Sequence, residues 1–154
     1  MRIKTNSLFC AVVIALATMA PVWAANPRPA DQQQASLYKR LGGYDALAAV
    51  TDDFLGRLSS DPQLSRFFKG QSTDSLKRIR THIVDFLCMA TGGPCAYIGR
   101  DMKTAHTGLG ITEEDWNAMA KDLNATFDKF NVPAKERQDV LTAVAGLKGD
   151  IVGR

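Results

Sequence analysis

The stretch GGPCAYIGRDMKTAH, residues 92–106, interrupts an otherwise helical pattern and contains one of only two histidines in the chain. The Gly-Gly-Pro sequence at its start ends the apolar helix before it, because a proline and glycines at that point do not continue a helix. The spacing of Met102, His106 and Leu109 then predicts a brief helix, closed by one of the glycines that follow His106. This spacing places His106 on the apolar side of that helix.

Helical spacing of apolar residues continues on both sides of this stretch. The predicted inward faces of four longer helices are Leu47, Val50, Phe54 and Leu58; Leu76, Ile79, Ile83, Phe86, Leu87 and Ala90; Trp116, Met119, Leu123, Phe127 and Phe130; and Val140, Leu141, Val144, Leu147 and Ile151. Thr73 or Asp74 is expected to cap the second helix, Thr112 and Asp115 form a capping box for the third, and Pro133 fits the first turn of the last. No segment alternates polar and apolar residues for long enough to predict a strand, so the fold class is all-α.

Residues 1–24 have the pattern of a secretory signal peptide. Two basic residues precede an apolar run, and small residues at its end predict cleavage after Ala24, with cleavage after Ala25 as the alternative. An uncleaved membrane anchor is the alternative, but the run is shorter than the roughly 20 apolar residues of a spanning helix, and a proline interrupts it. We therefore expect a periplasmic protein with a flexible tether over residues 25–36 and one domain over residues 37–154, without a membrane segment after cleavage.

Composition excludes several classes of protein. The chain of 154 residues is 45% hydrophobic and 23% charged, which is ordinary globular usage. Its formal net charge is +3, and removal of residues 1–24 leaves 17 basic and 16 acidic residues. A domain this close to neutral has no basic surplus for nucleic acid, which favours a small or apolar ligand. We expect a monomer.

Two cysteines, Cys88 and Cys95, remain after the predicted cleavage, because Cys10 lies in the signal peptide. They flank the Gly-Gly-Pro turn. An even pair across a tight turn in an exported protein predicts a disulfide, and two separate buried thiols are the alternative.

The two histidines limit the chemistry that the chain supports. His82 lies on the rim of the apolar face of its helix, about 40° from Phe86 on a helical wheel. Two histidines without clustered Cys, Asp or Glu make a poor zinc site, and the absence of C-x-x-C-H excludes c-type haem attachment. The interpretation that remains for His106 is a ligand to non-covalent haem, with a core histidine bonded to a backbone carbonyl as the alternative.

Several short motifs follow one another along the chain. They are LYKRLGG at 37–43, DFL at 53–55 with Asp61-Pro62, Phe67-Phe68, the stretch at 92–106, and GIT at 110–112. In this ordered set, residues 36–152 resemble the group I truncated haemoglobins. The resemblance implies a two-over-two helical sandwich around b-type haem, with His106 as the proximal iron ligand.

The resemblance also implies a set of residues that contact the haem. They are Phe54, Leu55, Phe68, Ile79, His82, Ile83, Phe86, Tyr97, Met102, His106, Leu109 and Trp116. Phe68 would pack flat on the macrocycle, and Tyr97 and Arg78 are candidates to hold a propionate. Most of the apolar members would serve equally as ordinary core.

The chain departs from the family pattern where a gas ligand would bind. Group I members usually have a tyrosine at the position of Leu55 and often glutamine at the positions of Ile79 and Ile83. These side chains donate hydrogen bonds to bound oxygen, whereas all three residues here are aliphatic. His82 aligns with a second iron-binding histidine of some cyanobacterial relatives, so it is either a distal iron ligand or a partner of a propionate.

The expected function is therefore binding of a diatomic gas, namely oxygen, nitric oxide or carbon monoxide. Three alternatives are a haem enzyme for nitric oxide or peroxide detoxification, a periplasmic electron-transfer protein, and a haem-free helical interaction module. An enzyme of this kind would need an external reductant, because the chain has no nicotinamide- or flavin-binding pattern.

Overall fold

The computed structural model describes residues 35–154, so the predicted signal peptide and nearly all of the tether lie outside the described residues. The elements are α2 (Leu37–Arg40), α3 (Gly43–Ser60), the 3-10 helix η1 (Ser65–Phe67), α4 (Thr73–Ala90), α5 (Met102–His106), α6 (Glu113–Lys129), α7 (Ala134–Ala145) and α8 (Lys148–Ile151). Every regular element within residues 35–154 is helical, which confirms the all-α fold class.

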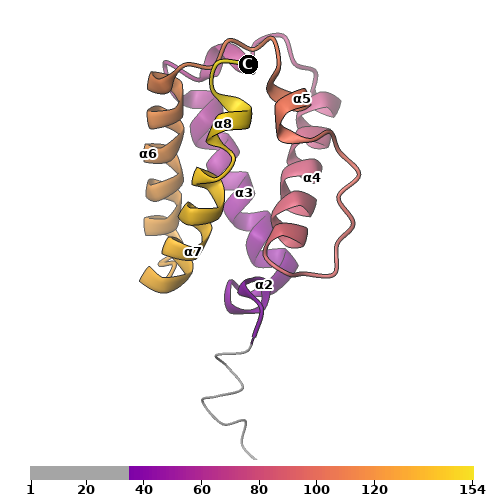
Figure 1. Cartoon of the computed structure of the whole chain (residues 1–154), viewed down its shortest axis with the longest axis vertical. Helices are drawn as coiled ribbons and strands as arrows, with labels where there is room; N and C mark the ends of the chain where they lie inside the picture. Colours follow the sequence, from indigo (N-terminus) through magenta and orange to yellow (C-terminus); the bar gives the residue numbers. More distant parts are fainter. Residues whose placement is uncertain (1–34) are drawn as a thin grey trace, which may run out of the picture.

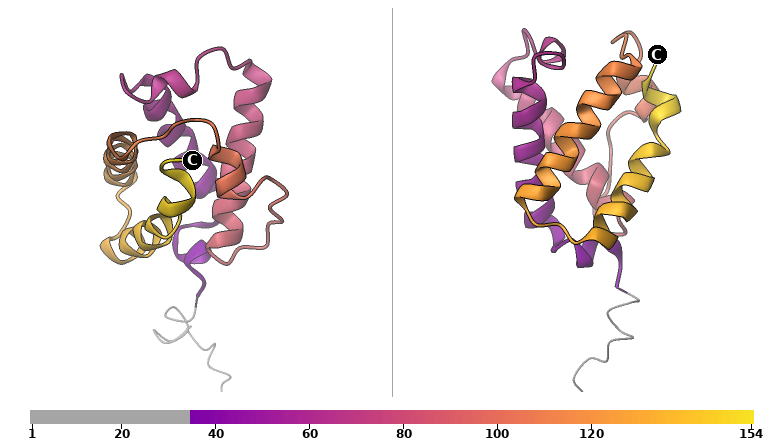
Figure 2. Two further views of the ribbon diagram at one scale, coloured as in Figure 1. Left: turned by 45° about the horizontal axis from the view of Figure 1, so that its top comes forward. Right: turned by 90° about the vertical axis from the view of Figure 1, so that its left-hand side faces the viewer.

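Two antiparallel pairs form the sandwich, α3 with α4 and α6 with α7 (Figures 1 and 2). The pairs meet where α3 packs against α6, and the short α5 lies beside α8. Leu123 and Phe127 of α6 pack with Val140 of α7 in the buried core, against half-buried apolar residues that include Phe54. Helices α4 and α5 face the α6–α7 pair (Figure 1).

Glycines permit two sharp turns. Gly42 is the N-cap of α3 and Gly43 its first residue, with φ of 97° and 80°. Gly92 after α4 has φ of 81°, and all three lie in the left-handed region that other residues avoid. At position 93, glycine is required because a side chain would not fit, and not because of its backbone angles. A Cβ there would lie 2.6 Å from Cys88 Sγ, so the backbone approaches this sulfur only because residue 93 has no side chain.

The start of α4 and the end of α5 differ from those predicted. Ser72, rather than Thr73 or Asp74, caps α4, and its hydroxyl accepts a hydrogen bond from the Ser75 amide at 3.1 Å. Three successive residues have equivalent capping chemistry, so the sequence alone selects no one of them. The helix α5 ends at His106, and Leu109 lies beyond it with 46% of its surface exposed.

The predicted last helix is two helices. Gly146 ends α7, and α8 starts at Lys148, because the chain turns at Gly146 and Leu147. Pro133 is the N-cap of α7, one position before the first turn where it was predicted. The capping box of α6 is confirmed, since Thr112 and Asp115 each accept a bond from the backbone amide of the other.

An ion-pair cluster joins α3 to α6. The Asp53 carboxylate accepts hydrogen bonds from Lys129, from Arg57 and from the Thr126 hydroxyl. The bonds from Lys129 and Arg57 lower the pKa of Asp53 to about 2. The carboxylate therefore stays ionised and holds the two helices together over the ordinary pH range.

The predicted disulfide is present and links Cys88 at the end of α4 to Cys95 in the loop before α5, with a Cα–Cα distance of 5.7 Å. The bond bridges residues seven apart, and Cys88 is fully buried. The cross-link therefore fixes the first half of the α4–α5 loop against α4.

We expect reduction of this disulfide to lower the free energy of unfolding of the apoprotein by about 2–3 kcal/mol, because the unfolded chain regains the entropy of an open loop. Chemical denaturation with and without a reductant measures the difference. The double variant Cys88→Ala/Cys95→Ala is the control and should not respond to reductant. Two freely alkylated thiols in the oxidised wild-type protein would contradict the prediction.

Candidate functional site

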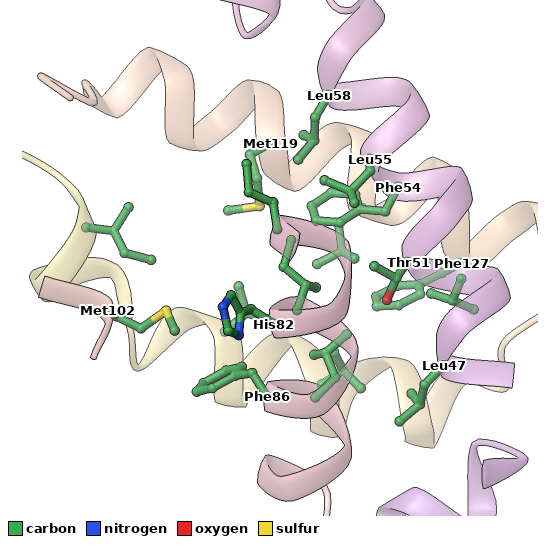
Figure 3. A pocket seen from close by; sticks show the side chains of 18 of the residues that line it. Leu47, Thr51, Phe54, Leu55, Leu58, His82, Phe86, Met102, Met119 and Phe127 are labelled. Carbon is green, nitrogen blue, oxygen red and sulfur yellow. The ribbon is translucent and has the colours of Figure 1, made fainter. Parts of the chain in front are cut away.

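A large cavity of about 710 Å³ lies between the two helix pairs. All twelve residues that the sequence assigned to a haem site line it: Phe54, Leu55, Phe68, Ile79, His82, Ile83, Phe86, Tyr97, Met102, His106, Leu109 and Trp116. Figure 3 shows part of this wall, with His82 and Phe86 projecting from α4 toward the side where Met102 enters from α5. These residues come from α3, α4, α5 and α6 and from the segments that follow η1, α4 and α5, and the fold gathers them around one apolar space.

His106 is the last residue of α5 and is half-buried in the cavity wall. Its Nδ1 lies 2.7 Å from the Met102 carbonyl oxygen, one turn earlier. A carbonyl only accepts hydrogen bonds, so Nδ1 carries the proton and donates it. The lone pair therefore lies on Nε2, which is the arrangement that metal-ligating histidines use to fix ring orientation.

The short helix that carries His106 is fixed at both ends. Asp101 caps its start by accepting hydrogen bonds from the Thr104 amide and hydroxyl, each at 2.8 Å. Beyond its end, the Gly153 amide donates to the Ile111 carbonyl at 2.9 Å, so the segment after α8 is bonded to the connection between α5 and α6. These contacts hold a helix of only five residues, which is too short to be stable alone.

His82 lies half-buried on α4, and its ring packs against aromatic neighbours. The Tyr97 ring meets it edge-on, with centroids 6.1 Å apart and planes at 83°. Tyr97 also meets the Phe86 ring edge-on at 5.3 Å. The imidazole is therefore a lining group of the cavity and not a solvated side chain on the outer face of α4.

Aliphatic and aromatic side chains dominate the wall formed by α3 and α4. Leu55, Ile79 and Ile83 all line it, at the positions where the sequence predicted a loss of hydrogen-bond donors. Among the lining residues of these two helices, Thr51 and His82 alone have polar side chains. Any polar ligand that approaches this wall has at most those two side-chain partners.

The Thr51 side chain was not among the sequence candidates. It lies one turn before Leu55 and is 1% exposed, and its hydroxyl has no hydrogen-bond partner. Figure 3 places it on α3, across the pocket from Met102. A polar residue on the apolar face of a predicted helix is the one sequence signal that could have identified it.

Of two arginines near the cavity, the one that lines it is not the one expected. Arg78, a candidate partner for a propionate, does not line the cavity, because it lies on the exposed side of α4 and donates a hydrogen bond to the Ser75 hydroxyl at 3.1 Å. Arg100 lines the cavity instead. The Tyr97 hydroxyl donates its proton to the Arg100 carbonyl at 2.5 Å, and burial raises the pKa of Tyr97.

We expect Thr51→Val to raise the free energy of unfolding of the apoprotein by about 1–3 kcal/mol, because valine keeps the shape and removes a buried hydroxyl without a partner. Thr126→Val is a matched control. That hydroxyl is equally buried but donates to Asp53, so its loss should destabilise the protein. Denaturation of both variants gives the comparison, and a less stable Thr51→Val would contradict the prediction.

The described residues fit a haem better than a bare metal ion. No group of three or more His, Cys, Asp or Glu within residues 35–154 is arranged to hold a metal. His106 instead offers one neutral nitrogen in the wall of a large apolar cavity, which is the donor set that haem iron takes when the macrocycle supplies the other ligands. No helix in the same part of the chain is long and apolar enough to cross a membrane.

Comparison with known proteins agrees with this fit. The family model described as bacterial-like globin matches residues 36–152. Group 1 truncated hemoglobin GlbN from Mycolicibacterium paratuberculosis is 36% identical over 119 residues, which cover 77% of this chain and 85% of that protein. The corresponding protein from Synechocystis is 36% identical over 118 residues, covering 74% and 90%.

Solved structures show the same fold. The truncated hemoglobin of Tetrahymena pyriformis in its Fe(III) form superposes with a TM-score of 0.71 at 28% identity, covering 78% of this chain and all of that one. The 2/2 hemoglobin of Synechococcus, solved in the cyanomet state with covalently attached heme, also has a TM-score of 0.71, at 30% identity over 78% and 100% of the two chains.

The family match over nearly all described residues, the two-over-two helix arrangement and the cavity with His106 in its wall all agree. The cofactor that follows is b-type haem, and the ligand class is a diatomic gas. This chain belongs to the bacterial-like globins, as a group I truncated haemoglobin.

Proposed function

We propose that this protein is an exported truncated haemoglobin in which His106 would hold the haem iron and His82 would compete with a gas for the opposite position. When bound, haem supplies the iron position at which a diatomic gas binds. The single observation that carries the proposal is the composition of the α3–α4 wall, where His82 is the one nitrogen donor among the lining side chains. His106 supplies the other nitrogen from α5.

The gas that this wall favours is uncharged and weakly polar. Leu55, Ile79 and Ile83 donate no hydrogen bond, so a strongly polarised ligand gains little from the wall. Competition by His82 also lowers the apparent affinity of any gas by the fraction of sites that are open. We therefore propose carbon monoxide or nitric oxide binding, or electron transfer, in place of oxygen storage.

The coordination of the iron tests this proposal. Absorption spectra of the ferric and ferrous protein should be those of low-spin iron, with split visible bands in the ferrous form. His82→Ala should give high-spin spectra, whereas Arg78→Ala, a change on the exposed side of the same helix, should leave them unchanged. High-spin spectra in the wild-type protein would overturn the role proposed for His82.

Export to the periplasm is the second part of the proposal. It is supported by the signal-peptide pattern of residues 1–24 and by the Cys88–Cys95 disulfide, since disulfides persist in oxidising compartments. Cell fractionation followed by N-terminal sequencing tests it. The expected product starts at Ala25 in the periplasmic fraction, and an uncleaved cytoplasmic protein would contradict it.

A further inference from the structure

The Tyr97 ring packs against the His82 ring. It comes from the α4–α5 loop and stands edge-on to His82 and to Phe86, which lies one turn after His82 on α4. A histidine on the rim of a helix face has rotamers that point toward and away from the cavity. An aromatic ring packed against the imidazole removes some of those rotamers, and aromatic pairs of this geometry are favourable.

Tyr97 is itself held at both ends. Its hydroxyl donates to the Arg100 carbonyl, which fixes the far end of the ring. The disulfide at Cys95, two residues earlier, ties the loop to α4. Gly99 folds so closely under the ring that any side chain there would overlap it.

The hydrogen bond from the Tyr97 hydroxyl to the Arg100 carbonyl leaves Tyr97 without a proton to donate to a haem propionate. A phenol has one proton, and the Arg100 carbonyl receives it. The hydroxyl therefore has no further proton to donate to a carboxylate of a cofactor. The contribution of Tyr97 to the cavity is the placement of its ring, which is half-buried between the loop and α4.

We propose that Tyr97, anchored by the Cys88–Cys95 disulfide, is a positioning residue that keeps the His82 imidazole directed into the cavity. The inference rests on the proposed function, in which His82 ligates the iron. Because the anchor is covalent, it keeps the first half of the α4–α5 loop, and with it Tyr97, close to α4. Loss of either Tyr97 or its anchor releases His82 to other rotamers.

The first test needs no haem. Proton NMR of the apoprotein observes two histidines only, because the chain has two, and His106→Ala assigns them. Tyr97→Leu and Cys88→Ala/Cys95→Ala should both move the His82 ring signals toward those of a free imidazole. Tyr97→Phe keeps the ring and should retain most of the wild-type shift. Ile98→Ala is the control in the same loop, since Ile98 is 85% exposed, and should change nothing.

The second test uses the haem protein. In Tyr97→Leu and in the cysteine-free variant, the high-spin fraction and the rate of carbon monoxide binding to the ferrous form should both rise about two- to tenfold, the factor that corresponds to one aromatic contact. Ile98→Ala should match the wild type. Unchanged His82 signals in folded apo Tyr97→Leu would overturn the role of Tyr97. Unchanged spectra in His82→Ala would instead overturn the proposed function. In that case, the NMR signals of the His82 ring in the apoprotein would still show whether Tyr97 holds the imidazole in place.

Discussion

His106→Ala should abolish stoichiometric haem binding, and free imidazole should restore it. The residue provides the nitrogen whose lone pair is freed by the bond between Nδ1 and the Met102 carbonyl, and its removal leaves α5 without a donor. Titration of the apoprotein with haem, followed at the Soret band, measures the stoichiometry. We expect no saturable binding in the variant at concentrations that saturate the wild type.

Two comparisons isolate this effect. Lys103→Ala changes an exposed residue of the same short helix and should bind haem normally. If His82 alone could hold the haem, binding would persist in His106→Ala and would be lost only in His106→Ala/His82→Ala. A wild-type spectrum in the His106→Ala variant would contradict the assignment of His106 as proximal ligand.

The second large effect concerns oxygen. We expect Leu55→Tyr to slow the release of oxygen by about ten- to a hundredfold, because a hydrogen bond to a strongly polarised group contributes about 1.5–3 kcal/mol. The comparison is best made in the His82→Ala background, where no imidazole competes for the iron. Stopped-flow displacement of oxygen by carbon monoxide gives the two rates.

Leu55→Phe controls for the added ring without the hydroxyl and should release oxygen as fast as the parent. Slow release from the parent protein, unaffected by Leu55→Tyr, would mean that another donor already reaches the oxygen. Thr51 is then the side chain to examine, because its hydroxyl is the one polar group of the α3 wall. Thr51→Val would accelerate release in that case and have no effect otherwise.

The fold and the two histidines could be predicted because they depend on patterns along the chain. Helical spacing places His82 on the rim of one apolar face and His106 on another, and both line the cavity. The ends of the helices were harder to predict from the sequence. Ser72 and Thr73 have the same capping chemistry, and a glycine such as Gly146 is tolerated within helices often enough that it does not mark an end.

The remaining features of the site depend on contacts between distant or irregular segments. The lack of a partner for Thr51 follows from how α3 packs against its neighbours, which no local pattern encodes. The bond from Tyr97 to the Arg100 carbonyl involves the backbone of a loop, so residue identity carries no signal for it. The disulfide was predictable because Cys88 and Cys95 are an even pair across a turn.

The short span of the disulfide has a consequence for the order of assembly. Closing a loop between residues seven apart costs less entropy than closing a longer one, and the two ends meet rapidly even in an unstructured chain. The contact between Asp53 and Lys129, by comparison, joins residues 76 apart and must wait for the helices to meet. Wherever an oxidant is present, the end of α4 and the loop that carries Tyr97 can therefore be joined before the two helix pairs dock. The end of α4 and the Tyr97 loop, which form part of the cavity wall, are then already linked when the rest of the globin folds against them.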